Sequence, residues 1–270
     1  NIKFLEWVSS YNLIPRGIVL RMILPKSEGY FIKDDDSKNS QDLLSPKYLK
    51  LNETQSKARA KIERIFLQND YSTILLDGMP GSGKTEVYFD LIAKNISSKK
   101  QSLILFPEVS LTNEFIKRVE ERFGCAPDIW HSKITPTKKR KIIERVISGK
   151  SQILIGARSA LFLPFKNLGL LIVDEEHDSS YKQEEKGIYN ARDMAVVRAS
   201  IEKFLIILVS ATPSLETLYN INQKKYTHIK LENKFSHTPE PKIKIINMKN
   251  VKLKKNNWVS EDLKKTMELK

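Results

Sequence analysis

Short apolar runs alternate from Tyr71 onward with longer segments in which apolar residues recur at helical spacing. The runs are rich in Ile, Leu and Val and lack polar alternation, which is typical of strands buried on both faces of a parallel sheet. Strands are predicted at 73–77, 102–106, 153–155, 170–174, 205–209 and 226–231, and helices at 53–67, 84–96, 110–123, 137–147, 191–201 and 214–220. This alternation predicts an α/β fold, a mostly parallel sheet with helices on both faces.

Residues at the ends of several predicted helices support these boundaries. Thr135-Pro136 and Thr212-Pro213 each place a hydroxyl where an N-cap sits and a proline at the first helical position. Gly124 follows the helix predicted at 110–123 and Gly149 the helix predicted at 137–147, where glycine commonly ends a helix. We therefore expect helices to begin next to these hydroxyls and to end at these glycines.

The pattern changes at both ends of the chain. Apolar clusters lie at 4–10 and 17–24, whereas 26–50 is mostly polar and is interpreted as a loop or linker. Two prolines and a Lys-rich stretch follow Glu232, so the compact domain is predicted to close near that residue. The predicted segments are a short N-terminal segment 1–25, a linker 26–50, a main domain 51–232 and a connection 233–270.

Composition narrows the choice of partners only slightly. Lys and Arg number 46 against 32 Asp and Glu, which gives a net charge of +14. Such a charge fits binding to nucleic acid or to an acidic membrane surface, or solubility alone. No run approaches the ~20 apolar residues that span a bilayer. The single cysteine, Cys125, excludes an internal disulfide framework and a Cys-rich zinc site, so a cytoplasmic protein without membrane association is expected.

A complete phosphate-binding loop follows the first predicted strand. Residues Gly78, Met79, Pro80, Gly81, Ser82, Gly83, Lys84 and Thr85 match the pattern G-x-x-x-x-G-K-[ST]. The glycines let backbone N–H groups turn toward phosphate oxygens, and the next helix adds the positive end of its dipole. Lys84 is expected to reach the β and γ phosphates and Thr85 to bind Mg²⁺. The less favoured alternative is a glycine-rich turn without a ligand.

An acidic cluster follows a later apolar run. The segment 170–173 leads into Asp174, Glu175, Glu176 and His177. An acidic group at the carboxyl end of a buried strand is what the Mg²⁺ side of a nucleotide site requires. Asp174 is expected to hold the metal through water, and Glu175 to orient or deprotonate the water that attacks the γ-phosphorus. Taken alone, these residues also fit a solvated acidic turn.

A segment with two hydroxyl side chains, Ser210-Ala211-Thr212-Pro213, follows the strand predicted at 205–209. Alone it fits an ordinary helix cap. Its position at a strand end beside the acidic cluster also suits hydroxyls that sense the γ-phosphate. We therefore count Ser210 and Thr212 among the coupling residues.

Five ordered segments together resemble the primosomal protein N′ (PriA) family of bacterial replication-restart helicases, members of helicase superfamily 2. They are G-M-P-G-S-G-K-T-E-V-Y, L-F-P-E-V-S-L-T, G-A-R-S-A-L-F-L-P-F, D-E-E-H-D-S-S-Y-K-Q and S-A-T-P-S-L-E-T. The match covers 51–231, and 7–25 resembles the segment that precedes the family's helicase core, the end of its N-terminal DNA-binding region. The resemblance implies a RecA-like P-loop NTPase lobe that uses ATP and Mg²⁺ in an ATP-dependent 3′ to 5′ DNA helicase of replication restart.

The resemblance assigns roles to residues of the nucleotide site. Residues that match catalytic positions are Lys84, Asp174, Glu175 and His177, and those that match nucleotide-binding positions beyond the phosphate loop are Gln55 and Glu86. The glutamine that corresponds to Gln55 reads adenine in such helicases. A helix-surface glutamine without that role is the alternative.

Other matching positions point to DNA. The segments 107–112 and 156–159 match family segments that touch the single-strand backbone, with Arg158 as a contact or coupling residue. The aromatic-rich loop that links strand binding to hydrolysis corresponds to 181–193 and contains Tyr181, Tyr189 and Arg192. The two tyrosines are candidates for stacking on bases, and packing within the loop is an equally weighted alternative.

The chain also departs from the family pattern. Gly187-Ile188 and Asn190 stand where the family often has Pro-Arg and His. Only 26–50 separates the N-terminal segment from the lobe, so no winged helix is expected there. The chain is interpreted as a piece of a longer one, with the second motor lobe, its arginine fingers and the family's zinc region outside it. We therefore expect this piece to bind nucleotide but barely to hydrolyse it.

Single-stranded and forked DNA are the expected partners, and the resemblance adds primosome and single-strand-binding proteins and a nucleoid-associated location. The basic helix predicted at 137–147 favours a solvated face over a DNA patch, and Trp130-His131 favours packing over metal binding. Two other functions stay open: a different superfamily 2 DNA translocase, and a nucleotide-gated DNA-binding module without catalysis.

Overall fold

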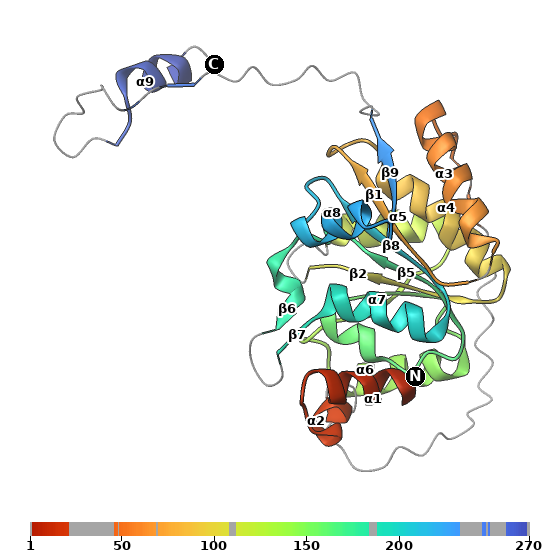
Figure 1. Cartoon of the computed structure of the whole chain (residues 1–270). Coiled ribbons are helices and arrows are strands. Elements are labelled where there is room, and N and C mark those ends of the chain that lie inside the picture. Colours follow the sequence, from red (N-terminus) through yellow and green to blue (C-terminus); the bar gives the residue numbers. More distant parts are fainter. Residues whose placement is uncertain are drawn as a thin grey trace. The chain divides into compact units, whose positions relative to one another are not determined.

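The computed structural model describes residues 2–21, 46–47, 49–68, 70–107, 112–183, 188–232, 245–246, 248 and 258–268 (Figure 1). The chain divides into two compact units, residues 1–236 and residues 237–270. The first unit, which ends at Ser236, holds the sheet. The second contains helix α9 (Glu261–Glu268).

A seven-stranded sheet with the order β3-β4-β2-β5-β8-β1-β9 forms the centre of the first unit. Its strands are β1 (Ser72–Gly78), β2 (Gln101–Leu105), β3 (Asp128–Trp130), β4 (Ile153–Gly156), β5 (Leu168–Val173), β8 (Leu205–Ser210) and β9 (Thr227–Leu231). All neighbouring strands pair in parallel, which confirms the α/β fold with a parallel sheet. The inner strands β2, β5 and β8 are buried along their whole length, because both faces are covered.

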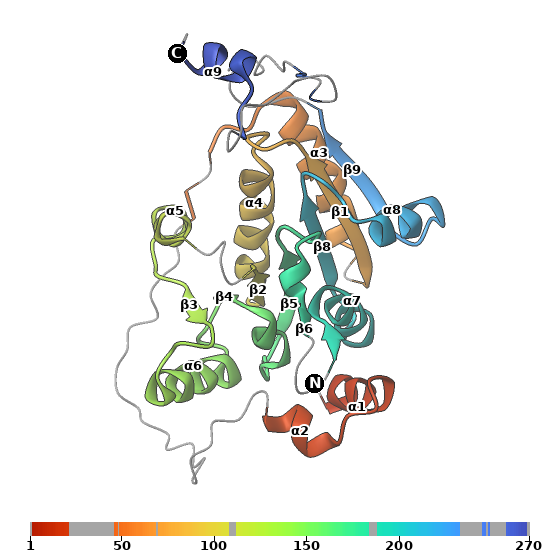
Figure 2. The same cartoon turned by 90° about the vertical axis from the view of Figure 1, so that its left-hand side faces the viewer.

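Helices cover both faces of the sheet (Figures 1 and 2). One face carries α3 (Glu53–Phe66), α4 (Lys84–Ser97) and α5 (Asn113–Phe123), and the other carries α1 (Ile2–Tyr11), α6 (Pro136–Ser148) and α7 (Ala191–Glu202). Successive residues of β1 point to opposite faces, so Leu75 joins the core under α7 while Ile74 and Leu76 join the core under α4. The sheet thus separates two hydrophobic cores.

Smaller elements connect these layers. They are α2 (Arg16–Arg21), α8 (Leu215–Asn222), the 3₁₀ helices η1 (Arg158–Phe162) and η2 (Ser179–Tyr181), and an antiparallel pair of two-residue strands, β6 (Lys182–Gln183) and β7 (Tyr189–Asn190). Strands β3, β6 and β7 were not predicted from the sequence. These strands are too short to show a period of two along the chain.

Helix ends follow the expected signals with one exception. Thr135 caps α6 by accepting a hydrogen bond from the Lys138 backbone N–H, and Gly124 and Gly149 end α5 and α6 with φ of +75° and +81°. The prediction that Thr212-Pro213 begins a helix is wrong. Helix α8 begins at Leu215, and its cap is Ser214, whose hydroxyl accepts from the Thr217 backbone N–H.

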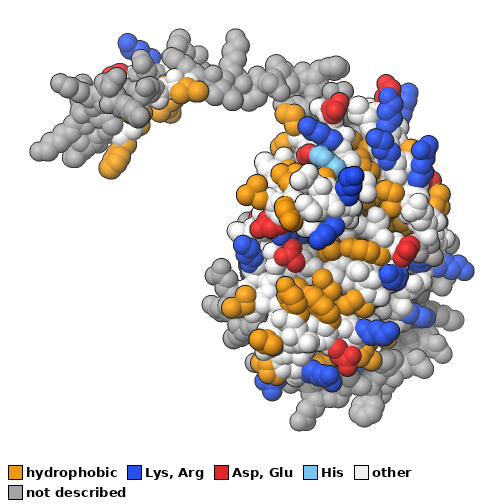
Figure 3. Space-filling view, in the orientation of Figure 1, with side chains coloured by type: hydrophobic (Ala, Val, Ile, Leu, Met, Phe, Trp, Pro, Cys, Tyr) orange, Lys and Arg blue, Asp and Glu red, His pale blue; other side chains and the backbone are white. Residues whose placement is uncertain are grey.

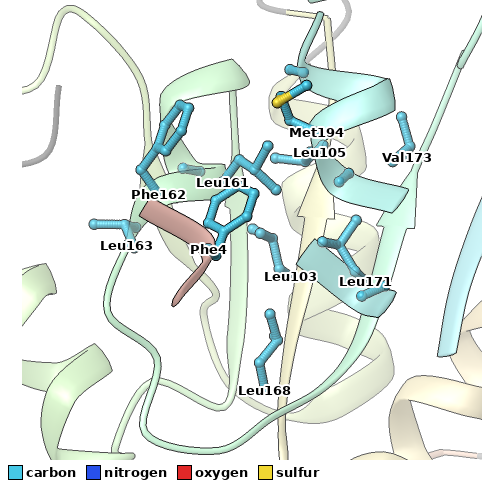
Figure 4. Close-up of a cluster of buried hydrophobic side chains, with 14 of the residues drawn as sticks. Phe4, Leu103, Leu105, Leu161, Phe162, Leu163, Leu168, Leu171, Val173 and Met194 are labelled. Atoms are coloured by element: carbon cyan, nitrogen blue, oxygen red, sulfur yellow. The ribbon is translucent and has the colours of Figure 1, made fainter. Parts of the chain in front are cut away.

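The N-terminal helix α1 packs into the first unit rather than standing apart from it. Phe4 lies among residues of β2, η1 and β5 (Figure 4). Its ring stacks on Phe162 at 5.8 Å and lies 5.6 Å from the guanidinium of Arg198, which is fully buried. The predicted linker 26–50, and with it the expectation of no winged helix, lies largely outside the described residues.

Candidate functional site

The predicted site residues meet at one edge of the sheet. The phosphate loop follows β1, the acidic cluster follows β5, and Ser210 ends β8. Strand β8 lies between β5 and β1, and Asp77 is in register with Ser210. Since parallel strands place their carboxyl ends together, three segments far apart in the sequence form one site, where ligands of open α/β sheets bind.

The phosphate loop has the backbone that its glycines permit. Gly81 and Gly83 have φ of +77° and +80°, and α4 begins at Lys84, directly after the loop. Gly78 is needed for a different reason: a Cβ there would lie 2.6 Å from Ser82 Oγ. The helix N-terminus and the loop N–H groups therefore lie next to each other, the arrangement that binds anions.

Lys84 and Ser82 make this loop suitable for a triphosphate. Lys84 Nζ donates to the carbonyl oxygens of Gly78 and Met79, so the cation lies over the loop. Ser82 Oγ is buried and has no hydrogen-bond partner among the described residues. A buried hydroxyl without a partner is costly. A phosphate oxygen is a suitable acceptor for it, so the residues present fit a nucleotide.

Electrostatics link the loop to the acidic cluster. Burial lowers the pKa of Lys84 below its ordinary value, and the negative charges of Asp174, Asp77 and Glu175 act in the opposite direction. Burial also raises the pKa of Asp174, against the hydrogen bond from Tyr88 and the nearby charge of Lys84. Lys84 and Asp174 thus stabilise each other's charged forms across the site.

The side chains of the acidic cluster differ in burial and in their hydrogen-bond partners. Asp174 is half-buried, and its Oδ2 accepts a 2.9 Å hydrogen bond from Tyr88 Oη of α4. Glu175 is exposed with φ of +49°, a left-handed backbone that is uncommon for a non-glycine residue. His177 Nδ1 lies 2.8 Å from Ser210 Oγ. The cluster therefore reaches both the phosphate loop and the end of β8.

Glu176 has a role that the sequence analysis missed. Its carboxylate turns into the protein and accepts hydrogen bonds from Ser214, Thr217 and Arg192. The only signal in the sequence is its place between Glu175 and His177, which does not distinguish an inward carboxylate from an outward one. Tyr88 was also missed, although it lies in one of the matched segments.

Gln55 contacts the phosphate loop. It forms a reciprocal capping box with Asn52 at the start of α3, and its Nε2 donates to the Ser82 carbonyl oxygen at 3.1 Å. The side chain is buried, so the interpretation as a plain surface glutamine is wrong. Its reading of adenine stays a prediction. Glu86, in the first turn of α4, pairs with Arg118 of α5.

The two tyrosines proposed to stack on bases are buried. Tyr181 is 1% exposed, and its Oη donates to the carbonyl oxygens of Leu105 and Asp174 at 3.0 and 2.6 Å. Tyr189 packs edge-on against Phe162 at 5.3 Å between ring centres. Neither ring presents a face for a base, so their proposed stacking is wrong for this conformation. Tyr181 instead ties the aromatic-rich loop to the acidic cluster.

The remaining coupling residues lie around this loop. Arg158 donates to the Lys182 carbonyl oxygen, and Arg192 is buried against Glu176. Ser210 Oγ accepts from the Thr212 backbone N–H at 3.0 Å as well as lying next to His177. Thr212 is exposed. The segments 108–111 and 184–187 lie outside the described residues.

Other charged groups are dispersed. On α6, Arg140 pairs with Glu144, Arg145 with Asp128, and Lys139 lies over the Trp130 ring. On the face drawn in Figure 3, Lys and Arg side chains are spread among acidic and apolar ones rather than gathered into one patch. Within the described residues no helix is long and apolar enough to cross a membrane, and no group of three or more His, Cys, Asp or Glu side chains is placed to hold a metal ion.

Alanine at Gly83 is expected to harm the site more than alanine at Gly81. Both positions have positive φ, so either substitution costs about 1–2 kcal/mol of backbone strain. Only at Gly83 would the new Cβ meet another group, Gln55 Nε2 at 2.1 Å, whereas nothing lies within 4 Å at Gly81. Thermal unfolding and nucleotide titration of both variants test this difference. Equal losses in the two variants would contradict the contact with Gln55.

Asp174→Asn is expected to unfold at a higher temperature than the wild type at neutral pH. A carboxyl whose folded pKa is raised adds stability below its unfolded pKa of about 3.9 and loses that contribution as the pH rises through the folded value. Since burial raises the Asp174 pKa, ionisation of this carboxyl is less favourable in the folded protein than in the unfolded chain, and asparagine removes that cost at about pH 7. The advantage of the amide is expected to disappear toward about pH 4 in unfolding scans. A variant less stable than the wild type at neutral pH would contradict it.

A family model described as DEAD/DEAH box helicase matches residues 52–221. Over 97% of its length the chain is 42% identical to the replication restart protein PriA of Rickettsia felis, of which it covers 39%. It is 40% identical to the replication restart protein PriA of Haemophilus influenzae, over 81% of this chain and 29% of that protein. The chain therefore spans less than half the length of these relatives.

A solved structure shares the fold. The structure titled "Structure of RecG bound to three-way DNA junction" superposes with a TM-score of 0.54 and 23% sequence identity, over 71% of this chain and 25% of that chain. At this identity the likeness concerns the fold alone. The parallel sheet with its phosphate loop after β1 therefore has the RecA-like fold that the sequence predicted, and the match to the DEAD/DEAH box helicase model identifies it as a helicase lobe.

Proposed function

Because the chain belongs to the DEAD/DEAH box helicase family, we propose that it forms the ATP-binding motor lobe of a DNA helicase that acts in replication restart. The observation that carries this proposal is the meeting of the phosphate loop, the acidic cluster and Ser210 at one edge of the sheet. The restart role and the 3′ to 5′ direction rest on similarity to replication restart proteins of which the chain covers only part.

Each group at this edge has a distinct task. The loop N–H groups, Ser82 and Lys84 hold the phosphates, and Gln55 reads the adenine from the start of α3. Thr85 and Asp174 are the residues that would hold Mg²⁺. When bound, Mg²⁺ supplies charge neutralisation at the phosphate oxygens. Glu175 orients or deprotonates the attacking water from its exposed position after β5.

DNA is proposed to bind along segments that border this site. Arg158 in η1 and the loop from Tyr181 to Arg192 are joined by the hydrogen bond from Arg158 to the Lys182 carbonyl oxygen. The tyrosines act from inside this loop rather than as stacking surfaces, since both are buried. Primosome and single-strand-binding proteins are proposed as partners on similarity alone.

The isolated chain is proposed to bind nucleotide and hardly to hydrolyse it. An arginine finger raises phosphoryl-transfer rates by about 10³–10⁵. In the related helicases such arginines belong to a second motor lobe. Titration of the 270-residue chain with a fluorescent ATP analogue, followed by a turnover assay, tests this. Fast DNA-stimulated turnover by this chain that is lost in Lys84→Ala would contradict it.

The helicase activity is tested with the protein at its full natural length. We expect it to displace the strand of a duplex that carries a 3′ single-stranded tail, and not of one that carries only a 5′ tail. DNA-stimulated ATP turnover without strand displacement would indicate a translocase. DNA binding with negligible turnover that Glu175→Gln leaves unchanged would indicate a nucleotide-gated binding module.

A further inference from the structure

Tyr88 lies on α4, about one turn after the residues that close the phosphate loop. Residues three or four positions apart share one face of a helix, so its side chain leaves α4 on the same side as those of Lys84 and Thr85. Its ring is fully buried in the core under α4 and packs edge-on against Phe89, at 5.3 Å between ring centres. The core therefore holds the ring in place, and the hydroxyl group contacts the residue that follows β5.

The Tyr88 hydroxyl orients the carboxylate of Asp174. Tyr88 Oη donates to Asp174 Oδ2 at 2.9 Å, and the Glu175 backbone N–H donates to the other oxygen, Oδ1, also at 2.9 Å. An ionised carboxylate offers about four acceptor positions. The two hydrogen bonds therefore orient the carboxylate and leave acceptor positions on it for a cation or for the water molecules of a cation.

The donor is an uncharged group, and this suits a cation site. An arginine or lysine at this position would compensate the charge of Asp174, whereas a hydroxyl orients the carboxylate and leaves its charge to attract a cation. Burial and the negative charge of Asp174 raise the pKa of Tyr88 well above its ordinary value, while a hydrogen bond with the Thr85 side chain acts in the opposite direction. The hydroxyl therefore keeps its proton and lies next to both residues that would hold Mg²⁺.

We propose that Tyr88 is a positioning residue for Mg²⁺: its hydroxyl holds the Asp174 carboxylate in the orientation that binds the cation together with Thr85. The inference rests on the proposed function, because it assumes that Mg²⁺ and nucleotide bind at this edge of the sheet. Hydrogen-bond partners of metal-binding side chains typically contribute about 10–100-fold to metal affinity. The alternative is a hydroxyl that only stabilises the core, and the two roles predict different effects of Mg²⁺ on nucleotide binding.

The test is the ratio of two nucleotide dissociation constants of the full-length protein, one measured in excess EDTA and the other at saturating Mg²⁺. A fluorescent, non-hydrolysable ATP analogue is the probe. Because the binding of Mg²⁺ and the binding of nucleotide are thermodynamically linked, the ratio reports how much more tightly the protein–nucleotide complex binds Mg²⁺ than free nucleotide does.

Tyr88→Phe removes one oxygen and keeps the ring in the core, so we expect the variant to fold, as thermal unfolding will show. It is expected to lower the ratio about tenfold, the lower end of the usual contribution of such a partner. The dissociation constant in EDTA is expected to stay near that of the wild type, because the loop N–H groups and Lys84 are unchanged. A purely structural role would lower the unfolding temperature and leave the ratio as it is.

Tyr71→Phe is the matched control. Tyr71 precedes β1, at the opposite end of that strand from the phosphate loop, and its Oη accepts a hydrogen bond from Thr73 Oγ1 at 3.0 Å. The substitution also removes one hydrogen-bonded tyrosine hydroxyl, but it is expected to keep the ratio at the wild-type value. If Tyr88→Phe leaves the ratio as unchanged as Tyr71→Phe does, the proposal is overturned.

The Mg²⁺ dependence of ATP turnover is a second measurement on the same variants. A positioning role predicts that Tyr88→Phe needs about tenfold more Mg²⁺ for half-maximal turnover, and that excess Mg²⁺ restores most of the maximal rate. A half-maximal Mg²⁺ concentration equal to that of the wild type would overturn the proposal.

Failure of the proposed function has a different signature in the same titrations. A wild-type ratio of one would show that the protein–nucleotide complex binds Mg²⁺ no better than free nucleotide does. That result would reject Thr85 and Asp174 as residues that hold Mg²⁺, and the inference with them. A wild-type ratio above one that Tyr88→Phe does not lower would reject the inference alone.

Discussion

Glu175→Gln is expected to lower the maximal rate of ATP hydrolysis by about 10²–10⁴, the contribution of a positioned general base. The structure places Glu175 after β5 in an exposed, left-handed conformation, next to Asp174 and with its charge near Lys84. Nucleotide affinity is expected to stay near that of the wild type, because glutamine removes the base but no group that holds phosphate. Steady-state turnover and fluorescent-nucleotide titration measure the two quantities separately.

Glu144→Gln is a suitable control for this substitution. Glu144 lies on α6, pairs with Arg140 and makes no described contact with the nucleotide site. Its replacement is expected to leave both turnover and affinity unchanged. If Glu175→Gln behaves like Glu144→Gln, then Glu175 is not the base.

Lys84→Ala is expected to lower turnover by about 10²–10³, the usual cost of removing one charge-stabilising donor, and to weaken nucleotide binding as well. Lys84 Nζ lies over the carbonyl oxygens of Gly78 and Met79, and the carboxylates around it oppose the effect of burial on its pKa. The loop thus holds a cation where phosphate charge is to be neutralised. Turnover at saturating ATP and direct titration distinguish the two losses.

Two other lysine variants sharpen this prediction. Lys94, on the same helix, pairs with Glu63, and Lys94→Ala is expected to change only stability. Lys84→Arg keeps the charge but replaces the compact ammonium with a planar guanidinium. Its turnover is therefore expected to stay close to that of Lys84→Ala rather than that of the wild type. Wild-type turnover in Lys84→Arg would show that charge alone is needed at this position.

Much of the fold follows from the sequence because buried parallel strands leave a strong signal. Runs such as 170–173 and 205–209 are apolar without alternation, and they form the inner strands β5 and β8. Glycines at 124 and 149 end helices in the left-handed conformation that glycine favours. The site's location then follows from topology, since the phosphate loop and the acidic cluster stand directly after strands of one sheet.

What could not be predicted depends on contacts between distant segments. Thr212 and Ser214 both offer a hydroxyl before α8. Ser214 is the N-cap, and it also contacts the inward carboxylate of Glu176, which lies 38 residues earlier in the chain. Tyr181 was predicted as a candidate for stacking on bases because its burial and its hydrogen bonds to the carbonyl oxygens of Leu105 and Asp174 produce no recognisable pattern in the neighbouring sequence. Neither contact changes the hydrophobic period of its own segment.

The packing of α1 against the first unit was likewise not predicted from the sequence, because it depends on residues far away in the chain. An apolar cluster at 4–10 indicates a buried face but not the partner of that face. The partners are Phe162 of η1 and Arg198 of α7, a fully buried arginine that also donates to the Leu161 carbonyl oxygen. The N-terminal helix thereby touches the element that carries Arg158, at the edge of the proposed DNA path.

The measurement that tests the central claim most directly is ATP hydrolysis by the full-length protein with and without single-stranded DNA. A DNA-dependent motor whose nucleotide site is built by this lobe requires that DNA raise the rate and that both Lys84→Ala and Glu175→Gln abolish the increase. A rate that does not respond to DNA, or a DNA-stimulated rate that survives in Lys84→Ala, would contradict the account.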